Sequence, residues 1–378
     1  MVLVLHRHKE RVRHIHSRVT SRRPDHEARA MRTILTLVSM FVSFYCLSAI
    51  CSLFVGLDIE VMTQADMVMG VAFLIPTAAG LLGNSTLLCL YSYTLLTGQK
   101  VRPTDPILNH LVFVNNLVVL SRGIPQTMAG FGWKNFLDDT GCKIVLYFFR
   151  VARGISLNTT CFLSGFQVIK LCTRNSWWKI STRFPRCFGF CASLFWILQL
   201  LLNFSVPLKV IGPRHKQNVT VHLRYRYCST VPPQPLGTLL HAVLLFLSDV
   251  VCLVFMIWAS VSMVLFLHRH KERVQHIHSR IPSRRPDHEA RATCTILTLV
   301  SMFVSFYCLS AISTACISLS KLPRLWLVDT SLFLGVGFSV LSPFVLINRD
   351  TRLTQVFISA LKTCFHNLVN FHYIRFYS

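Results

Sequence analysis

The chain has 378 residues, of which 14% are charged, and its mean hydropathy is +0.50. A typical soluble domain carries about 25% charged residues, so this composition excludes an ordinary soluble protein, which would expose large apolar patches. The formal net charge of +24 would suit a nucleic-acid partner, but the basic residues lie in short segments between apolar stretches, which is where membrane proteins place them and argues against nucleic-acid binding.

Eight apolar stretches are each long enough to form a helix that crosses a bilayer, which takes about 20 apolar residues. In chain order we predict them at 33–55, 68–97, 107–129, 142–171, 187–210, 236–267, 292–318 and 325–347. The sequence therefore predicts an all-α membrane protein with three parts. These are an extra segment with one hydrophobic helix at 1–61, a seven-helix bundle at 62–350 and a tail at 351–378.

The first of these stretches belongs to an internal repeat. Residues 1–50 agree with residues 263–312 at 44 of 50 positions, the six differences falling at 4, 13, 19, 20, 31 and 32. A single, nearly unchanged copy is not a solenoid repeat and indicates a recent duplication or the joining of two related loci. Its helix is either a passive appendage or, as an alternative hypothesis, a competitor for the place of 292–318.

Positive charge in the connecting segments predicts which way the chain faces, because cytoplasmic segments carry an excess of Lys and Arg. Residues 1–32 hold nine Lys and Arg against three acidic residues, and 268–291 hold seven, so both are expected in the cytoplasm, together with 172–186 and the tail after Ile347. The segment 211–235 then lies outside, although it is basic. It contains Cys228 and the glycosylation sequon at Asn218, and Cys142 begins its span on the same side.

Three further sequons, at Asn84, Asn158 and Asn203, fall within or against apolar stretches. The glycosylation enzyme does not reach such positions, so we interpret these three as chance matches. Asn218 is the expected glycosylation site.

Several blocks carry a family resemblance. They include GLLGNS (80–85), RPTDPILNHL (102–111), SRGIPQTMAGFGWKNFLDDTGCK (121–143), RVARGISLNTTC (150–161), LHRHKERVQHIHSR (267–280) and SPFVLINRD (342–350). From Met62 to about residue 350 the chain resembles the vomeronasal type-1 receptors, a family of G-protein-coupled pheromone receptors. Residues 1–61 fall outside the family pattern, whose usual start corresponds to Met62. Phe149 also departs, since His is common there.

The resemblance implies a seven-helix bundle in the plasma membrane, with an extracellular pocket for a small pheromone and a heterotrimeric G protein, of the inhibitory type, on the cytoplasmic face. It also implies a disulfide between Cys142 and Cys228. Sulfated steroids and other amphiphilic anions are plausible ligands of such a receptor.

Ionisable residues inside apolar stretches are costly and are therefore candidates for function. Arg150 and Arg153 lie eight and eleven residues past Cys142, and Asp249 lies thirteen past Leu236. A rise of 1.5 Å per residue puts them about 12, 16 and 20 Å below the outer boundary. With Arg122, three arginines face one aspartate. They either fix helix packing or attract an anionic ligand head.

Aromatic residues complete the predicted ligand site, with Tyr147, Phe148 and Phe149 at the top of the third helix of the bundle and Trp326 at the top of the seventh. Such residues also serve as packing or interface anchors, so both roles stay open.

No catalytic constellation, cofactor motif or complete set of metal ligands is present in the sequence. The histidine-rich segment 268–280 lacks the Cys or carboxylate partners of a metal site and is expected to be a solvated cytoplasmic loop. A receptor is therefore the leading prediction, and a poorly expressed receptor relic is the alternative. A transporter is disfavoured because the chain lacks paired repeats around broken helices.

Overall fold

The computed structural model describes residues 62–97, 102–133, 136–172, 177–212, 223–224, 227–230, 237–277, 286–319 and 325–349. The predicted span at 33–55, the whole extra segment 1–61, the tail 351–378 and the glycosylation site Asn218 lie outside the described residues.

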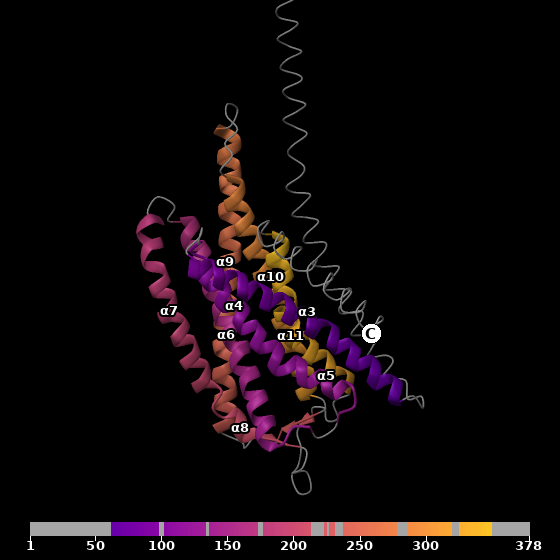
Figure 1. The fold of residues 1–378 in the computed structure, drawn as a ribbon. Coiled ribbons are helices and arrows are strands. Elements are labelled where there is room, and N and C mark those ends of the chain that lie inside the picture. The colour runs from indigo at the N-terminus through magenta and orange to yellow at the C-terminus, as the bar shows by residue number, and fades with distance from the viewer. Residues whose placement is uncertain are drawn as a thin grey trace, which may run out of the picture. The chain divides into compact units, whose positions relative to one another are not determined.

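Helices dominate the described part of the chain (Figure 1). α3 (Met62–Thr97) comes first, and α4 (Asp105–Val118), the π-helix η1 (Val119–Gly123) and α5 (Ile124–Gly130) then follow one another without a break. After them come α6 (Asp139–Cys172), α7 (Trp177–Leu202), α8 (Val206–Lys209), α9 (Gly237–Ile277), α10 (Pro286–Leu319) and α11 (Leu325–Arg349).

Six segments of the described chain are long and apolar enough to cross a membrane, namely Met67–Leu96, Asp105–Gly130, Cys187–Lys209, Val243–Arg269, Thr293–Ile317 and Trp326–Asn348. α6 supplies the seventh helix of the predicted set. Its apolar character is diluted by residues such as Arg150, Arg153 and Gln167, which lower its hydropathy. The predicted all-α membrane fold is confirmed, and the chain is a multi-pass membrane protein.

Two predicted cytoplasmic loops are shorter than expected. α9 runs on to Ile277, so most of the segment 268–280 that we predicted as a loop is helical, and α7 already begins at Trp177 within the predicted loop 172–186. The extension of α9 has a local reason. Lys271, Glu272 and Arg273 are good helix formers, and no Gly or Pro occurs between 268 and Pro282.

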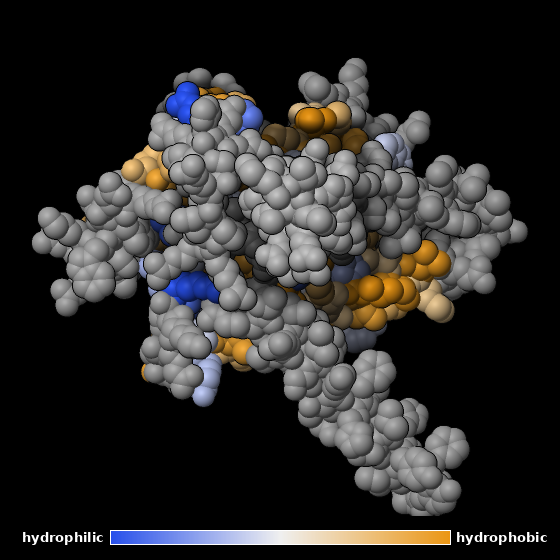
Figure 2. All heavy atoms as spheres, turned by 90° about the horizontal axis from the view of Figure 1, so that it is seen from above, coloured by the Kyte–Doolittle hydropathy of each residue, from blue (hydrophilic) through white to orange (hydrophobic). Residues whose placement is uncertain are grey.

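Burial divides the helices into an inner and an outer group. α6 and α11 form much of the core, where Phe149, Ile155 and Val336 belong to one buried apolar cluster. α7 and α9 instead expose apolar side chains, for example Val251 at 66% and Trp258 at 56%. Figure 2 shows exposed apolar residues of the described chain as orange patches. In a membrane protein these side chains face lipid rather than water.

Small residues let α3 and α11 approach closely. A Cβ atom placed on Gly80 would lie 3.2 Å from the Val340 Cα atom, and one on Gly83 would lie 3.0 Å from the Pro343 ring. In the same contact, the side-chain amide of Asn84 donates to the Ser339 carbonyl oxygen at 2.8 Å. Backbone approach through glycine, together with a hydrogen bond between helices, is how helices associate in lipid.

Candidate functional site

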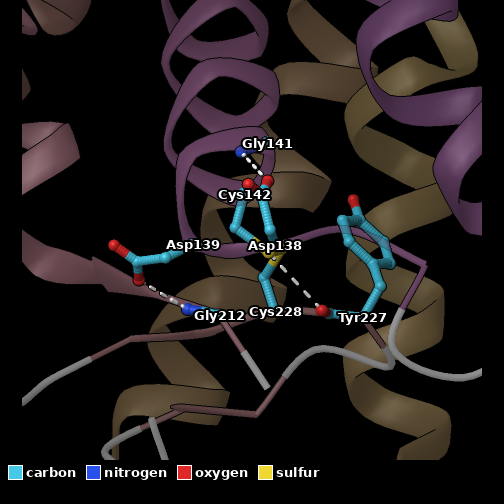
Figure 3. The surroundings of a disulfide bond; sticks show 7 residues. All are labelled: Asp138, Asp139, Gly141, Cys142, Gly212, Tyr227 and Cys228. Carbon is cyan, nitrogen blue, oxygen red and sulfur yellow. Dashed lines mark hydrogen bonds between the residues drawn. A yellow bond between two sulfur atoms is a disulfide. The ribbon is translucent and has the colours of Figure 1, made fainter. Parts of the chain in front are cut away.

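A disulfide between Cys142 and Cys228 ties an extended segment to the start of α6 (Figure 3). The segment forms a small antiparallel sheet of β1 (Val210–Ile211), β2 (Leu223–Arg224) and β3 (Ser229–Thr230), in the order β1-β3-β2. The sequence pattern had not predicted these two-residue strands.

The same corner of the molecule is held by a hydrogen bond to the Asp139 carboxylate and by close backbone packing. The Gly212 amide donates to the Asp139 Oδ1 atom at 2.9 Å. A Cβ atom on Gly212 would lie 2.8 Å from the Asp139 nitrogen, so this approach requires glycine. The segment is therefore fixed at two points above the end of the bundle.

Below this corner lies a buried polar group built on the π-helix η1. Arg122, 4% exposed, lies over the Phe149 ring, with its guanidinium carbon 4.8 Å from the ring centroid. One helical turn later, the Gln126 side-chain amide donates to Asp329 Oδ1 at 3.2 Å, and both residues are buried. The departure noted at Phe149 thus places an aromatic ring where it can hold a cation.

Asp329 corrects the charge count made from the sequence. We counted three arginines against Asp249 alone, but Asp329 is a second acid inside the same bundle, 3% exposed on α11. The sequence could have identified this buried acid, because Asp329 lies within the predicted span 325–347, four residues from its start.

A second polar group joins α6, α9 and α10. The Arg153 guanidinium lies 4.7 Å from the centroid of the Tyr307 ring and donates to the Ser310 hydroxyl at 3.3 Å. The Tyr307 hydroxyl donates in turn to the Asp249 carboxylate. Arg153 and Asp249, which the sequence placed at similar depth, are thus connected through Tyr307, which the sequence did not single out.

A small cavity of about 20 Å³ lies against this group. Its polar wall is formed by Arg153, Tyr307, Ser156 and Ser339, and Phe303 and Phe338 are among its apolar lining residues. A space of this size holds about one water molecule. In this conformation it has room for one small group of a ligand rather than for a whole ligand.

Beneath the cavity, the buried side-chain amide of Asn115 is hydrogen-bonded to hydroxyl groups from two helices. The side chains of Ser156 and Ser339 both donate to Asn115 Oδ1, at 3.0 and 3.2 Å. The Asn115 amide nitrogen donates to the Ser342 hydroxyl at 2.9 Å. Residues far apart in the sequence, on α4, α6 and α11, therefore share one hydrogen-bonded cluster.

The remaining residues predicted for the ligand site are dispersed. Arg150 is exposed on α6, and Lys209, which the sequence pattern did not single out, lies close enough for the two charges to interact. The Tyr147 hydroxyl donates to the Leu200 carbonyl oxygen at 3.1 Å, and Trp326 is 38% exposed at the start of α11. Of the residues predicted for the ligand site, only Arg153 lines the small cavity.

The three sequons interpreted as chance matches fall on buried side chains. Asn84 is 0% exposed, Asn158 6% and Asn203 3%, and Asn84 and Asn203 donate to backbone carbonyls within the bundle. An enzyme acting on exposed chain has no access to them.

The arrangement can bind a small molecule through hydrogen bonds and apolar contacts. Guanidinium groups can bind acceptor atoms, serine hydroxyls can form hydrogen bonds, and aromatic rings can surround an apolar body.

Comparison with known proteins identifies the family. The model of the vomeronasal organ pheromone receptor family matches residues 1–63 and 67–359. The match to 1–63 corrects our expectation that the extra segment falls outside the family pattern, since a near-copy of 263–312 carries family sequence itself.

Named relatives agree with that match. The chain is 46% identical over 319 residues to vomeronasal type-1 receptor 1 of Gorilla gorilla gorilla, covering 83% of this chain and 89% of the relative. It is 45% identical over 275 residues to vomeronasal type-1 receptor 4 of Homo sapiens, covering 72% and 91%. It is also 29% identical over 296 residues to olfactory receptor class A-like protein 1 of Danio rerio, covering 78% and 92%.

These relatives are named as receptors and not as enzymes, which agrees with the absence of a catalytic motif from the sequence. With seven helices of the expected order and a family match along nearly its whole length, the chain belongs to the vomeronasal organ pheromone receptor family, the vomeronasal type-1 receptors.

Proposed function

We propose that this protein is a plasma-membrane receptor of sensory neurons that detects a small amphiphilic pheromone, binds it from the outside and activates an inhibitory-type G protein. The ligand is an amphiphilic anion such as a sulfated steroid. Its charged head lies near Arg150 or Arg153, and its apolar body lies among aromatic side chains. Phe149, Tyr147, Trp326 and Asp249 belong to the same proposed site.

The excess of positive charge in the outer half of the bundle supports an anionic ligand. Arg122, Arg150 and Arg153 carry three positive charges, and Asp249 and Asp329 carry two negative charges, which leaves one positive charge before Lys209 is counted. Charges of one sign in a low-dielectric cleft raise the local concentration of an oppositely charged ligand. The exposed guanidinium of Arg150 can hold sulfate or carboxylate oxygens in a two-bonded geometry.

The test is a G-protein activation assay on surface-expressed receptor with sulfated steroids and their neutral parents. We expect a response to the sulfated forms, reduced about 10-fold or more by Arg150→Ala or Arg153→Ala, since a charge-assisted bond contributes about 1.5–3 kcal/mol. Lys143→Ala is the matched control. Lys143 is a cation on the same helix that pairs with Asp139 at 2.5 Å on the exposed side. An Arg153→Ala receptor with full potency would remove Arg153 from the proposal, and equal responses to neutral parents would remove the anion.

Two features support the proposed orientation, with the disulfide side outside and the C-terminus in the cytoplasm. Disulfides persist in oxidising compartments, and the basic ends of α9 and α10 lie in segments with the charge excess of cytoplasmic loops. Epitope tags on the tail should be detected only after the cells are made permeable. In the same cells, ligand should dissociate inhibitory-type heterotrimers in preference to stimulatory-type ones.

A further inference from the structure

The small cavity between α6, α10 and α11 has a defined hydrogen-bonding polarity. Two of its polar groups, the Ser156 and Ser339 hydroxyls, already use their single O–H donor on Asn115 Oδ1, at 3.0 and 3.2 Å. A hydroxyl has one donor and two acceptor lone pairs, so these two serines are left with acceptors to offer a guest. The Asn115 amide nitrogen donates to Ser342 on the other side. The amide oxygen therefore faces Ser156 and Ser339, and both serines must donate to it.

Arg153 supplies the complementary donors. Its guanidinium has five N–H groups, one of which donates to Ser310, while the flat face lies over Tyr307. Among the described residues, no other oxygen accepts a hydrogen bond from the Arg153 guanidinium. One side of the cavity therefore donates and the other accepts.

Size and polarity together select the group that fits. A space of about 20 Å³ takes one water-sized group and is too small for a sulfate or carboxylate. An ionised sulfate has only acceptor atoms, which would face the lone pairs of Ser156 and Ser339. An alcohol can accept from Arg153 and donate to a serine at the same time.

We infer that the cavity is a subsite for a hydroxyl group of the ligand, held between Arg153 and the serines Ser156 and Ser339. This inference rests on the proposed function for the other end of the ligand, where the anionic head binds toward Arg150 and Lys209. The receptor's preferred ligand is then an amphiphile with an anion at one end and a free alcohol at the other. A single water molecule offers the same hydrogen bonds as the alcohol, and the experiment separates the two.

The experiment compares a steroid sulfate that has a free hydroxyl at the opposite end with its deoxy and methoxy analogues, in the G-protein activation assay. On the unaltered receptor we expect the deoxy and methoxy forms to be about 5- to 10-fold weaker or more. The deoxy form leaves buried polar groups without their partner, and the methoxy form also exceeds the space.

In the double variant Ser156→Ala/Ser339→Ala, the preference for the alcohol should shrink to about 2-fold or less. Ser342→Ala is the matched control. Ser342 also binds Asn115 but does not line the cavity, so this variant disturbs the same cluster and should keep the alcohol preference. Surface delivery and the melting temperature of each variant are measured first. If the double variant does not fold, Ser156→Ala and Ser339→Ala are tested singly, and each should reduce the preference for the alcohol.

The outcomes are distinct. If the deoxy form is as potent as the alcohol on the unaltered receptor, the cavity keeps its own water and the inference is wrong, while the anionic-ligand proposal stands. Equal loss of preference in Ser342→Ala would also overturn it, because the effect would then be structural. If none of the steroid sulfates activates the receptor, the proposed ligand class fails and this inference fails with it.

Discussion

Tyr307 connects Arg153 with Asp249, because its ring contacts Arg153 and its hydroxyl donates to Asp249. Tyr307→Phe keeps the ring and leaves the half-buried carboxylate without this donor. We expect the free energy of unfolding to fall by about 1–3 kcal/mol, measured by thermal denaturation in detergent. Tyr147→Phe, at an exposed hydroxyl, should change it by less than about 0.5 kcal/mol. Equal shifts in the two variants would contradict a special role for Tyr307.

For single residues, the sequence predicted the depth of a side chain in the membrane better than the residues that this side chain contacts. Counting helical rise put Arg153 and Asp249 near the same level, and the structure joins them through one side chain. The sequence could not identify Tyr307 as the connecting residue. The face that α10 presents depends on the rotation of that helix against α6 and α9, which the sequence does not specify. Arg122 was identified as a buried cation, but its aromatic partner Phe149 was identified for a different reason, as a departure from a family pattern.

The contact between α3 and α11 depends on the absence of side chains at two positions. Gly80→Leu would force an isobutyl group against the Val340 backbone, and we expect a loss of about 1–3 kcal/mol from overpacking, visible as a lower melting temperature and reduced surface expression. Gly189 is the matched control, since nothing lies within 4 Å of a Cβ atom there. Gly189→Leu should be neutral or stabilising by up to about 1 kcal/mol, because leucine favours the helix over glycine. Unchanged stability of Gly80→Leu would show that the two helices adjust freely.

The disulfide closes a long loop, since Cys142 and Cys228 are 86 positions apart in the sequence. Cys228→Ser should lower the free energy of unfolding by about 2–5 kcal/mol, mainly by freeing the unfolded chain. Cys308→Ser, at an exposed free cysteine, is the control and should change little. Treatment with a reductant should lower the melting temperature of the unaltered protein but not that of Cys228→Ser. A reductant effect that persists in the variant would mean that another bond carries the stabilisation.

The helices themselves were predicted well, since hydropathy over about 20 residues is a strong signal. The predicted span 325–347 corresponds to α11, and 107–129 corresponds to α4, η1 and α5 taken together. What hydropathy could not predict was the π-helix at Val119–Gly123 or the three short strands, because neither changes the apolar content of the chain. The helical extension of α9 was missed for the opposite reason, since polar sequence was assumed to be loop.

For the whole molecule, the role of the extra segment 1–61 has a direct test. A chain that starts at Met1 and one that starts at Met62 should be compared for surface expression by flow cytometry and then for ligand response per receptor. Because 62–350 already supplies seven helices in the family order, we expect the shorter chain to reach the surface at least as well and to respond equally. A shorter chain that fails to reach the surface would show that the extra segment is required for insertion. Much weaker expression of the longer chain alone would favour the receptor relic.

The π-helix has a consequence for how relatives of this protein can differ. A π turn holds one residue more than an α turn, and each residue rotates an α-helix by about 100°. Deleting one residue from Val119–Gly123 would convert the π turn into an α turn with the same rotation, so the segments on either side would keep their facing. Gln126 would then still face Asp329. The same deletion in a regular part of the span would instead turn one side of the helix by that angle and exchange the side chains presented to the interior. A length change of a single residue is therefore tolerated best at this turn, and alignments within the family should allow a gap here.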